Sequence, residues 1–221
     1  MLGPSMADVI SGRVNPSGKL PFSFPKKLED NGAHHFGEVS YPGIEGTSAG
    51  NAVADLKGAD VSAGNDPRQE YLEDIFVGYR WHDVKKIPAL FPFGYGLSYT
   101  TFDYGKATLS SKEISADGSI TITVPVTNTG NVEGKEIVQL YIQDEKSSLP
   151  RPIKELKRFK KITLAPGQTK EVAFTITPQD LKFFDDTKHE WIVEPGKFKA
   201  MIGASSTDIR TTCLLYTSDA A

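Results

Sequence analysis

The sequence predicts a mostly β fold, with an immunoglobulin-like β-sandwich in its second half. From Thr101 onward, short segments alternate apolar and polar residues with the two-residue period of half-buried strands. Turn residues separate these segments, and the 14 prolines and 20 glycines are spread along the chain, which favours many short elements over a helical bundle. About seven strands at this spacing are typical of a sandwich of roughly 100 residues.

The first 25 residues predict short, irregular elements. Residues 5–12 suit the last turns of a helix that Ser5 caps and Gly12 ends. A turn is predicted at Asn15–Gly18, and the prolines in Leu20–Pro25 favour an edge strand or an extended segment. These pieces are too short to form a core of their own.

The next part of the chain combines a long loop with aromatic segments. Residues 31–70 are rich in small and polar residues without a sustained period, so they predict a long surface loop. Residues 75–81 form an apolar and aromatic strand candidate. In residues 91–99, glycines and aromatics interleave, which suits either tight packing or a platform for carbohydrate.

The strands of the sandwich are predicted from alternating apolar positions. The clearest segments are 120–126, 138–142, 172–176 and 198–202. Turns are predicted between them at 128–131, 165–168 and 195–196.

The sandwich is expected to end near Ile209. Residues 210–221 resemble translated read-through of a sequencing adapter, so we interpret them as a non-native tail; the alternative is a last strand followed by a tail. The single cysteine, Cys213, excludes an internal disulfide framework and a cysteine-rich zinc site.

Charge and hydropathy exclude several classes of partner. The net charge of −3 and the pI of about 5.8 give no electrostatic footprint for nucleic acid or an anionic membrane. No apolar run approaches the roughly 20 residues of a spanning helix. Oligomeric state, sugar specificity and localisation are not readable from these features.

Several motifs together resemble family-three glycoside hydrolases of the β-glucosidase type. The first group comprises 7–10 with 15–21, then 75–81, then 91–102, in the order that the family has them. Residues 126–130, 134–141 and 151–159 resemble the fibronectin type III-like domain of the same family. The likeness covers nearly everything before Arg210.

The resemblance implies a domain plan. Residues 1–100 would be the C-terminal remnant of an α/β sandwich domain and residues 101–209 a fibronectin type III-like domain. The family's aspartate nucleophile and glutamate acid/base would lie upstream of Met1, so no catalytic residue is expected here and the isolated chain is expected to be inactive. The full parent would hydrolyse terminal, non-reducing β-linked sugars with retention and without a cofactor.

The acidic pairs of this chain are not expected to take the place of the catalytic aspartate and glutamate. Adjacent Glu73 and Asp74 predict a solvated strand start or a salt bridge, because successive strand residues face opposite sides. The pairs Asp144–Glu145 and Asp185–Asp186 lie in turn contexts where carboxylates cap backbone amides.

Two further groups also have a structural interpretation. His34, His35 and Glu38 lack a third nitrogen or sulfur ligand, and nearby glycines disfavour a helix, so we expect no metal site. A run of basic residues alternates with apolar ones and predicts a solvated strand face instead of a polyanion site. Its members are Lys154, Lys157, Arg158, Lys160 and Lys161.

Aromatic residues are the remaining candidates for substrate contact. The group Tyr79, Arg80, Trp81, Phe93, Tyr95 and Tyr99 either walls part of a substrate cleft or packs between domains. Tyr95, Phe93 and Arg80 are the candidate substrate contacts. Trp191 is expected to fill the sandwich core or its edge, since a sugar-binding role would require its exposure.

A second functional class remains open on fold alone. An independent carbohydrate-binding or cell-surface adhesion module also uses an immunoglobulin-like sandwich. The sequence before Phe102 disfavours it, because this stretch resembles part of an enzyme domain and has little periodic structure of its own.

Overall fold

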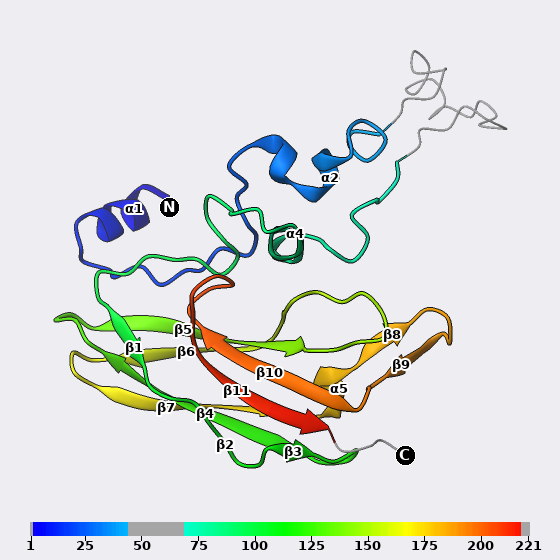
Figure 1. Cartoon of the computed structure of the whole chain (residues 1–221). Helices are drawn as coiled ribbons and strands as arrows, with labels where there is room; N and C mark the ends of the chain where they lie inside the picture. Colours follow the sequence, from blue (N-terminus) through cyan, green and yellow to red (C-terminus); the bar gives the residue numbers. More distant parts are fainter. Residues whose placement is uncertain (1, 44–68, 218–221) are drawn as a thin grey trace, which may run out of the picture. The chain divides into compact units, whose positions relative to one another are not determined.

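The computed structural model describes residues 2–43 and 69–217, and the chain divides into two compact units (Figure 1). One unit combines residues 1–23 with residues 91–221, and the other spans Phe24–Leu90. The first unit contains the sandwich. The structure is mostly β, as the alternating pattern predicts.

Helix α1 (Leu2–Ile10) opens the first unit. Gly12 follows it with a φ of +76°, a left-handed conformation that glycine adopts without strain. The predicted helix is therefore present, but it begins at Leu2, so Ser5 lies within it instead of capping it. Met6 and Ile10 are 52% and 77% exposed, which leaves apolar surface of this helix uncovered.

One sheet of the sandwich is built around a long central strand. Strand β4 (Ile120–Asn128) pairs antiparallel with β7 (Thr169–Ile176) along one side. Along its other side it pairs with β1 (Phe102–Tyr104) and β2 (Thr108–Leu109). Residues of β4 alternate between buried and half-buried along the whole strand, as their sequence pattern predicts.

The second sheet has five strands in the order β3-β11-β10-β5-β6. Their bounds are β3 (Glu113–Ile114), β5 (Gly134–Asp144), β6 (Glu155–Leu164), β10 (Gly196–Gly203) and β11 (Ile209–Thr217). Among the described strands, β3 and β11 are the one pair that runs parallel. A break in the register between Leu140 and Tyr141 marks a bulge where β5 meets the edge strand β6.

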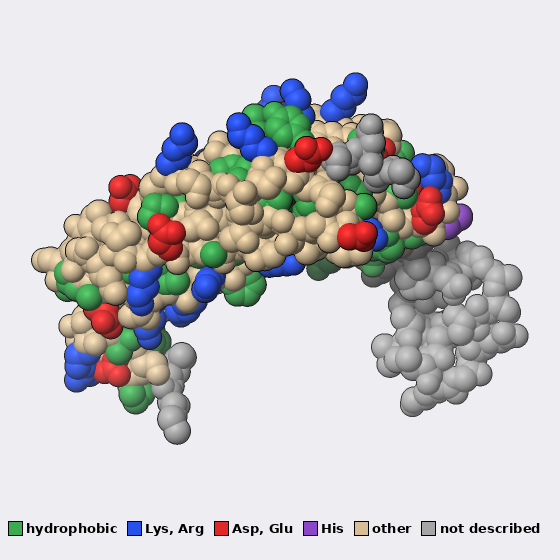
Figure 2. Space-filling model, turned by 90° about the horizontal axis from the view of Figure 1, so that it is seen from below, with side chains coloured by type: hydrophobic (Ala, Val, Ile, Leu, Met, Phe, Trp, Pro, Cys, Tyr) green, Lys and Arg blue, Asp and Glu red, His purple; other side chains and the backbone are tan. Residues whose placement is uncertain are grey.

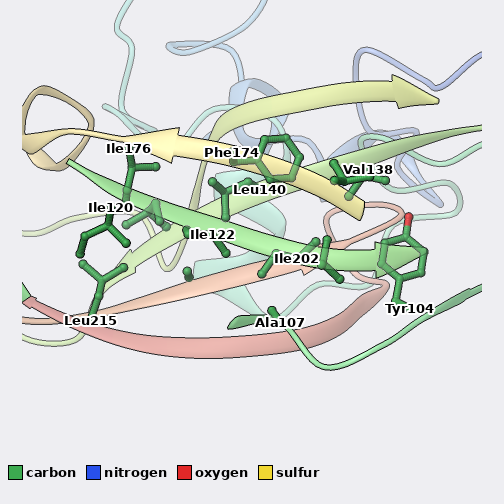
Figure 3. Packing of buried hydrophobic residues seen from close by; sticks show 14 of the residues in the cluster. Tyr104, Ala107, Ile120, Ile122, Val138, Leu140, Phe174, Ile176, Ile202 and Leu215 are labelled. Atoms are coloured by element: carbon green, nitrogen blue, oxygen red, sulfur yellow. The ribbon is translucent and has the colours of Figure 1, made fainter. Parts of the chain in front are cut away.

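The core lies between these two sheets. Figure 3 shows side chains of Ile122 and Phe174 from the first sheet meeting Leu140 and Ile202 from the second. Ile122, Leu140 and Ile202 have no exposed surface. Burying each such aliphatic side chain stabilises the fold by about 1.5–3 kcal/mol, so the sandwich holds itself together without a disulfide.

The predicted end of the sandwich near Ile209 is wrong. Residues 209–217 form β11, which pairs with β10 from Gly196 to Gly203. Leu215 of this strand is fully buried in the core. Residues 209–217 therefore belong to the sheet, although their sequence resembles read-through, because their backbone pairs with β10 and Leu215 enters the core. The non-native origin of residues 210–221 stays a prediction.

A small hairpin separates β7 from β10. Helix α5 (Pro178–Leu181) begins with a capping box, in which Thr177 and Asp180 satisfy each other's backbone amides. Strands β8 (Phe183–Asp185) and β9 (Glu190–Ile192) then form a two-stranded sheet of their own. Figure 1 shows this hairpin at the end of the sandwich where α5 also lies.

The second unit contains short helices and turns. Among its described residues these are the 3-10 helix η1 (Leu28–Asp30) and the helices α2 (Gly32–His35) and α4 (Tyr79–Lys85). Trp81 of α4 is 2% exposed, and its indole N–H donates to the carbonyl of Asp30 over 3.1 Å. The predicted loop at 31–70 contains α2 in its first part, and its residues 44–68 lie outside the described residues.

The strand predicted at residues 75–81 is wrong, because this segment enters α4. Gly78 adopts a φ of +62° immediately before the helix, which breaks an extended backbone. Strand propensity reflects packing on a sheet, and the described residues of this unit offer no strand against which Ile75–Trp81 can pair. Burial of Trp81 on a helix decides the conformation instead.

Surface charge follows the balanced composition. In Figure 2, acidic and basic side chains are interspersed with apolar ones over the visible face. None of the described helices has the length and hydropathy required to cross a membrane.

Candidate functional site

The residues from Phe91 to Tyr99, here called the aromatic segment, are held against the start of the chain. The amide of Gly94 donates to the carbonyl of Leu20, and the amide of Leu20 donates to the carbonyl of Tyr95, both over 2.8 Å. Ser23 Oγ accepts from the amide of Phe93 over 3.1 Å. Two stretches that lie about 75 residues apart in sequence are thus paired like neighbouring strands.

Gln139 of β5 fastens the aromatic segment to the sandwich. Its side-chain amide donates to the carbonyls of Gly94 and Ala204, over 3.1 and 2.8 Å. Its oxygen accepts from the hydroxyl of Tyr141 over 2.5 Å. Gly94 has a φ of +79°, and a Cβ there would overlap the Gln139 side chain. Glycine is required at this position for both reasons.

A buried ion pair reinforces this attachment. The ammonium of Lys19 lies 3.0 Å from a carboxylate oxygen of Glu136, and it also donates to the carbonyl of Ala204 over 3.0 Å. The two side chains are only 15% and 8% exposed. Removing one partner of such a pair leaves an uncompensated charge, so the pair specifies where the Gly18–Leu20 stretch lies.

Tyr104 of β1 has a buried hydroxyl that lies in the same region. Its hydroxyl is buried and has no hydrogen-bond partner among the described residues. Burial raises the pKa of Tyr104 well above its ordinary value, and the negative charge of Glu136 raises it further. The phenol therefore stays protonated, and the Arg210 guanidinium lies 5.8 Å from the ring centroid.

Asn15 organises the adjoining turn. Its side-chain oxygen accepts from the amide of Tyr99 over 2.8 Å and from the hydroxyl of Ser98 over 3.0 Å. Its side-chain nitrogen donates to the carbonyl of Glu133 over 3.0 Å. The Tyr99 hydroxyl donates to the carbonyl of Val9 over 2.7 Å, which connects α1 to the same arrangement.

These contacts surround an open hollow of about 620 Å³. Residues 10–15, Tyr99 and residues 132–135 line it. Its rim is apolar at Ile10, Val14 and Val132, and Glu133 is the single carboxylate in the lining. Retaining hydrolysis of a glycoside needs two carboxyl groups about 5–5.5 Å apart, so the hollow does not supply that chemistry. Its exposed apolar rim suits packing against further protein surface.

The three candidate substrate contacts fall into different units. Phe93 and Tyr95 are half-buried in the aromatic segment, and the Tyr95 ring lies 5.4 Å from that of Phe91. Arg80 is half-buried on α4, in the Phe24–Leu90 unit. Phe93 and Tyr95 are thus brought together within one segment, and their contact with substrate stays a prediction.

The acidic candidates have structural partners. Asp144 accepts from the amide of Lys146 over 3.0 Å and pairs with Arg151 at 3.2 Å. Asp185 accepts from the amide of Thr187 over 3.0 Å, so both turn caps expected from the sequence are confirmed. The Thr187 hydroxyl bond is the main cause that lowers the pKa of Asp185 below its usual value.

Two other acidic residues of the sequence analysis complete this picture. Glu145 pairs with Lys199 at 3.3 Å. Glu73 differs from expectation: it is 8% exposed in a turn instead of solvated at a strand start, and it accepts a hydrogen bond from the Ser40 hydroxyl over 3.4 Å. Asp74 beside it adopts a left-handed φ of +54°.

The histidine pair belongs to an aromatic cluster. A helical turn, α2, does form here despite the glycines, and it places His35 with its ring 5.1 Å from that of Trp81. His34 packs edge-on against Tyr41 at 4.3 Å. Glu38 lies beyond α2, and the described part of the chain contains no cluster of three metal-ligating side chains.

The basic run departs from the prediction in two places. Lys154 is 7% exposed, so it is not part of a solvated face. Phe159, expected to alternate inward, is 68% exposed on β6. A bulge in the pairing of β5 with β6 precedes Phe159 and interrupts the alternation of this edge strand, whereas Lys154 lies before the first residue of β6.

Trp191 also departs from its prediction. It is 64% exposed on β9, although the sequence suggests a place in the core or at its edge. Strand β9 pairs only with β8, outside both sheets of the sandwich, so its side chains do not enter the main core. The sequence signal that distinguishes this case is the turn-rich stretch Asp185–His189 between two aromatic residues, Phe184 and Trp191.

Two family models match the chain. Residues 2–99 match the glycosyl hydrolase family 3 C-terminal domain, and residues 136–206 match a fibronectin type III-like domain. The two matches together include the aromatic segment, Asn15, Gln139 and the β8–β9 hairpin.

Curated relatives share the same region. Beta-glucosidase BoGH3A of Bacteroides ovatus is 56% identical over 210 residues, which cover 95% of this chain and 25% of the relative. Thermostable beta-glucosidase B of Acetivibrio thermocellus is 43% identical, covering 94% of this chain and 24% of the relative. The chain thus spans about a quarter of the length of these relatives.

Solved structures show the same fold. Beta-glucosidase 3B from Thermotoga neapolitana, in complex with glucose, matches with a TM-score of 0.80 and 34% identity over 98% of this chain and 27% of that one. Beta-glucosidase from Kluyveromyces marxianus, in complex with glucose, matches with a TM-score of 0.79 and 36% identity over 99% of this chain and 23% of that one.

Proposed function

We propose that this chain, which belongs to glycosyl hydrolase family 3, supports a β-glucosidase without supplying the catalytic carboxylates. In the full protein, the reaction would be hydrolysis of terminal, non-reducing β-linked sugars with retention. Relatives named as β-glucosidases support this activity class. Membership of an enzyme family disfavours the alternative of an independent adhesion module.

The structural partners of the acidic side chains support the proposed lack of catalysis. A nucleophile and an acid/base must both face the reacting carbon of the sugar. Asp144 instead forms an ion pair with Arg151, which also pairs with Glu155 at 2.9 Å. Asp185 accepts a hydrogen bond from an amide of its own turn. The catalytic pair would therefore come from the rest of the full-length enzyme.

The contacts of Gln139, Lys19 and Asn15, here called the clamp, support the proposed role. Gln139, Lys19 and Asn15 fix the ends of the C-terminal-domain sequence to the sandwich through contacts that are long-range in sequence. The hollow beside this clamp exposes Ile10, Val14 and Val132, an apolar rim suited to packing against the remainder of the enzyme. The sandwich would thereby hold Phe93 and Tyr95 at the edge of the substrate cleft.

A hydrolysis assay tests this proposal. The purified chain is incubated with p-nitrophenyl β-glucoside and β-xyloside, beside full-length beta-glucosidase 3B from Thermotoga neapolitana as the positive control. The matching region of that relative, expressed alone, is the control for loss of activity by truncation. We expect turnover only by the full-length enzyme. Turnover by the purified chain that scales with its concentration and persists through repurification would contradict the proposal.

A further inference from the structure

The β8–β9 hairpin presents two aromatic side chains to solvent. Phe184 and Trp191 are directly opposite each other across the two strands, with ring centroids 5.7 Å apart and planes inclined by 65°. They are 46% and 64% exposed. On β8, the neighbours of Phe184 are Phe183 and Asp185, which point the other way and are buried, at 9% and 4% exposed. The hairpin therefore has one anchored face and one aromatic face.

The anchored face is held on several sides. The Arg151 guanidinium lies 4.8 Å from the ring centroid of Phe183, and Arg151 is itself fixed by Asp144 and Glu155. Asp185 accepts from the hydroxyl of Thr187 over 2.6 Å and from the amide of Lys188 over 3.2 Å. A hairpin with a fixed base and a capped turn holds its aromatic pair in one orientation, which lowers the entropy cost of binding.

The exposed aromatic surface has the size of the contact that a small ligand makes. From the exposed fractions of Phe184 and Trp191, the pair leaves roughly 250 Å² uncovered. A surface of this size matches a ligand that covers one or two rings.

Charge around the pair disfavours an ionic ligand. The exposed residues of the turn and of β9 include Asp186, Lys188 and Glu190, which carry charges of both signs. Lys188 also pairs with Asp185 at 3.3 Å, which reduces its attraction for an external anion. A neutral ligand with apolar faces and hydroxyl edges suits this mixture of aromatic and polar groups.

We propose that Trp191 is the stacking residue of a binding site for a neutral saccharide chain, and that Phe184 positions its indole. The rings meet edge to face, so they form a corner instead of a flat platform, and the more exposed indole provides the stacking face. A β-linked glucose chain fits this geometry, because its pyranose rings carry equatorial hydroxyls and present C–H surfaces on both faces. Exposed His189, in the turn that precedes β9, is available for contacts with hydroxyls.

Calorimetric titration of the whole chain tests the proposal. Cellohexaose and laminarihexaose are titrated into the wild-type protein and into Trp191→Ala and Phe184→Ala. Phe159→Ala is the matched control, since Phe159 is 68% exposed on a different strand. We expect affinity to fall about tenfold or more in Trp191→Ala, less in Phe184→Ala, and not at all in Phe159→Ala. Melting temperatures of the variants check that each retains its fold.

Three results would overturn the proposal. One is the absence of heat with both hexasaccharides up to about 10 mM, well above the range of weak sugar binding. Another is equal affinity in the wild type and in folded Trp191→Ala. The third is a self-association, measured by sedimentation velocity, that Trp191→Ala abolishes while saccharide binding is unchanged, which would assign the aromatic pair to a second copy of the chain. A parallel titration with mannohexaose, whose axial 2-hydroxyl interrupts one sugar face, should show weaker binding than cellohexaose.

Discussion

Gly94 and Gln139 show how single residues join the two halves of the first unit. The missing side chain at Gly94 admits the Gln139 amide, which reaches the carbonyls of Gly94 and Ala204. The neighbouring pair of Lys19 and Glu136 adds a charge interaction to the same place. The place of the aromatic segment and of Lys19 against the sandwich is therefore determined by a few buried polar contacts and not by apolar burial alone.

Replacing Gly94 with alanine should destabilise the first unit more than the same change at Gly167. Both glycines have a left-handed φ, +79° and +72°. Backbone strain in either alanine variant should therefore lower the free energy of unfolding by about 1 kcal/mol. Only at Gly94 does the new methyl group meet another side chain, which adds about 1–3 kcal/mol of overpacking. Urea unfolding of the two variants measures the difference. Equal losses of unfolding free energy would show that Gln139 moves aside freely.

The residues that could be predicted from the sequence are those with local partners. Asp144 and Asp185 accept from amides two residues away, and a turn context is enough to expect such caps. The Lys19–Glu136 pair joins residues more than 100 positions apart, so no local pattern announces it. Exposure of Trp191 depends on β9 standing outside the main sheets, which its local alternation does not reveal.

At the scale of elements, alternation predicts strands that pack on a core. Strands β4, β5, β7 and β10 appear where their apolar positions alternate, because each buries one face between the sheets. Helix α4 is missed because Tyr79–Trp81 has the composition of a strand, whereas Gly78 ends the extended backbone and Trp81 is buried on the helix that follows. Strand β11 is missed because its pairing with β10, and not its own pattern, determines it.

Two adjacent leucines of β11 should respond differently to truncation. Leu215 is fully buried in the core, whereas Leu214 next to it is 43% exposed. Leu215→Ala should lower the free energy of unfolding by about 2–5 kcal/mol, and Leu214→Ala by less than about 1 kcal/mol. Thermal and urea unfolding measure both changes. If Leu215→Ala were as mild as Leu214→Ala, residues 209–217 would not be a core strand.

At the scale of the whole molecule, apolar burial is concentrated in the first unit. The hydrophobic cluster between the two sheets includes residues from β1 through β11, whereas Trp81 is the single large apolar side chain fully buried in the described part of Phe24–Leu90. Stability that comes from core burial should therefore be distributed unevenly between the units.

Hydrogen exchange should separate the two units by protection. Amides of β4, β5 and β10 should exchange only by global unfolding of the sandwich, while amides of α2 and α4 should exchange through smaller openings and much earlier. Exchange followed by mass spectrometry, with peptides covering Ile120–Asn128 and Tyr79–Lys85, measures this order. Equal protection of the two peptides would mean that the chain unfolds as one cooperative unit.

The ion pair of Lys19 has a consequence for how the chain acquires its structure during synthesis. The Lys19 ammonium donates to the carbonyl of Ala204, which lies 185 positions later in the sequence. At about 5–20 residues per second, a ribosome needs roughly 10–40 s to add the residues between them. During that interval residues 15–20 lack the surface to which they attach, so their docking must follow translation of Ala204. Residues 15–20 can thus reach their final contacts only after sequence that is synthesised much later.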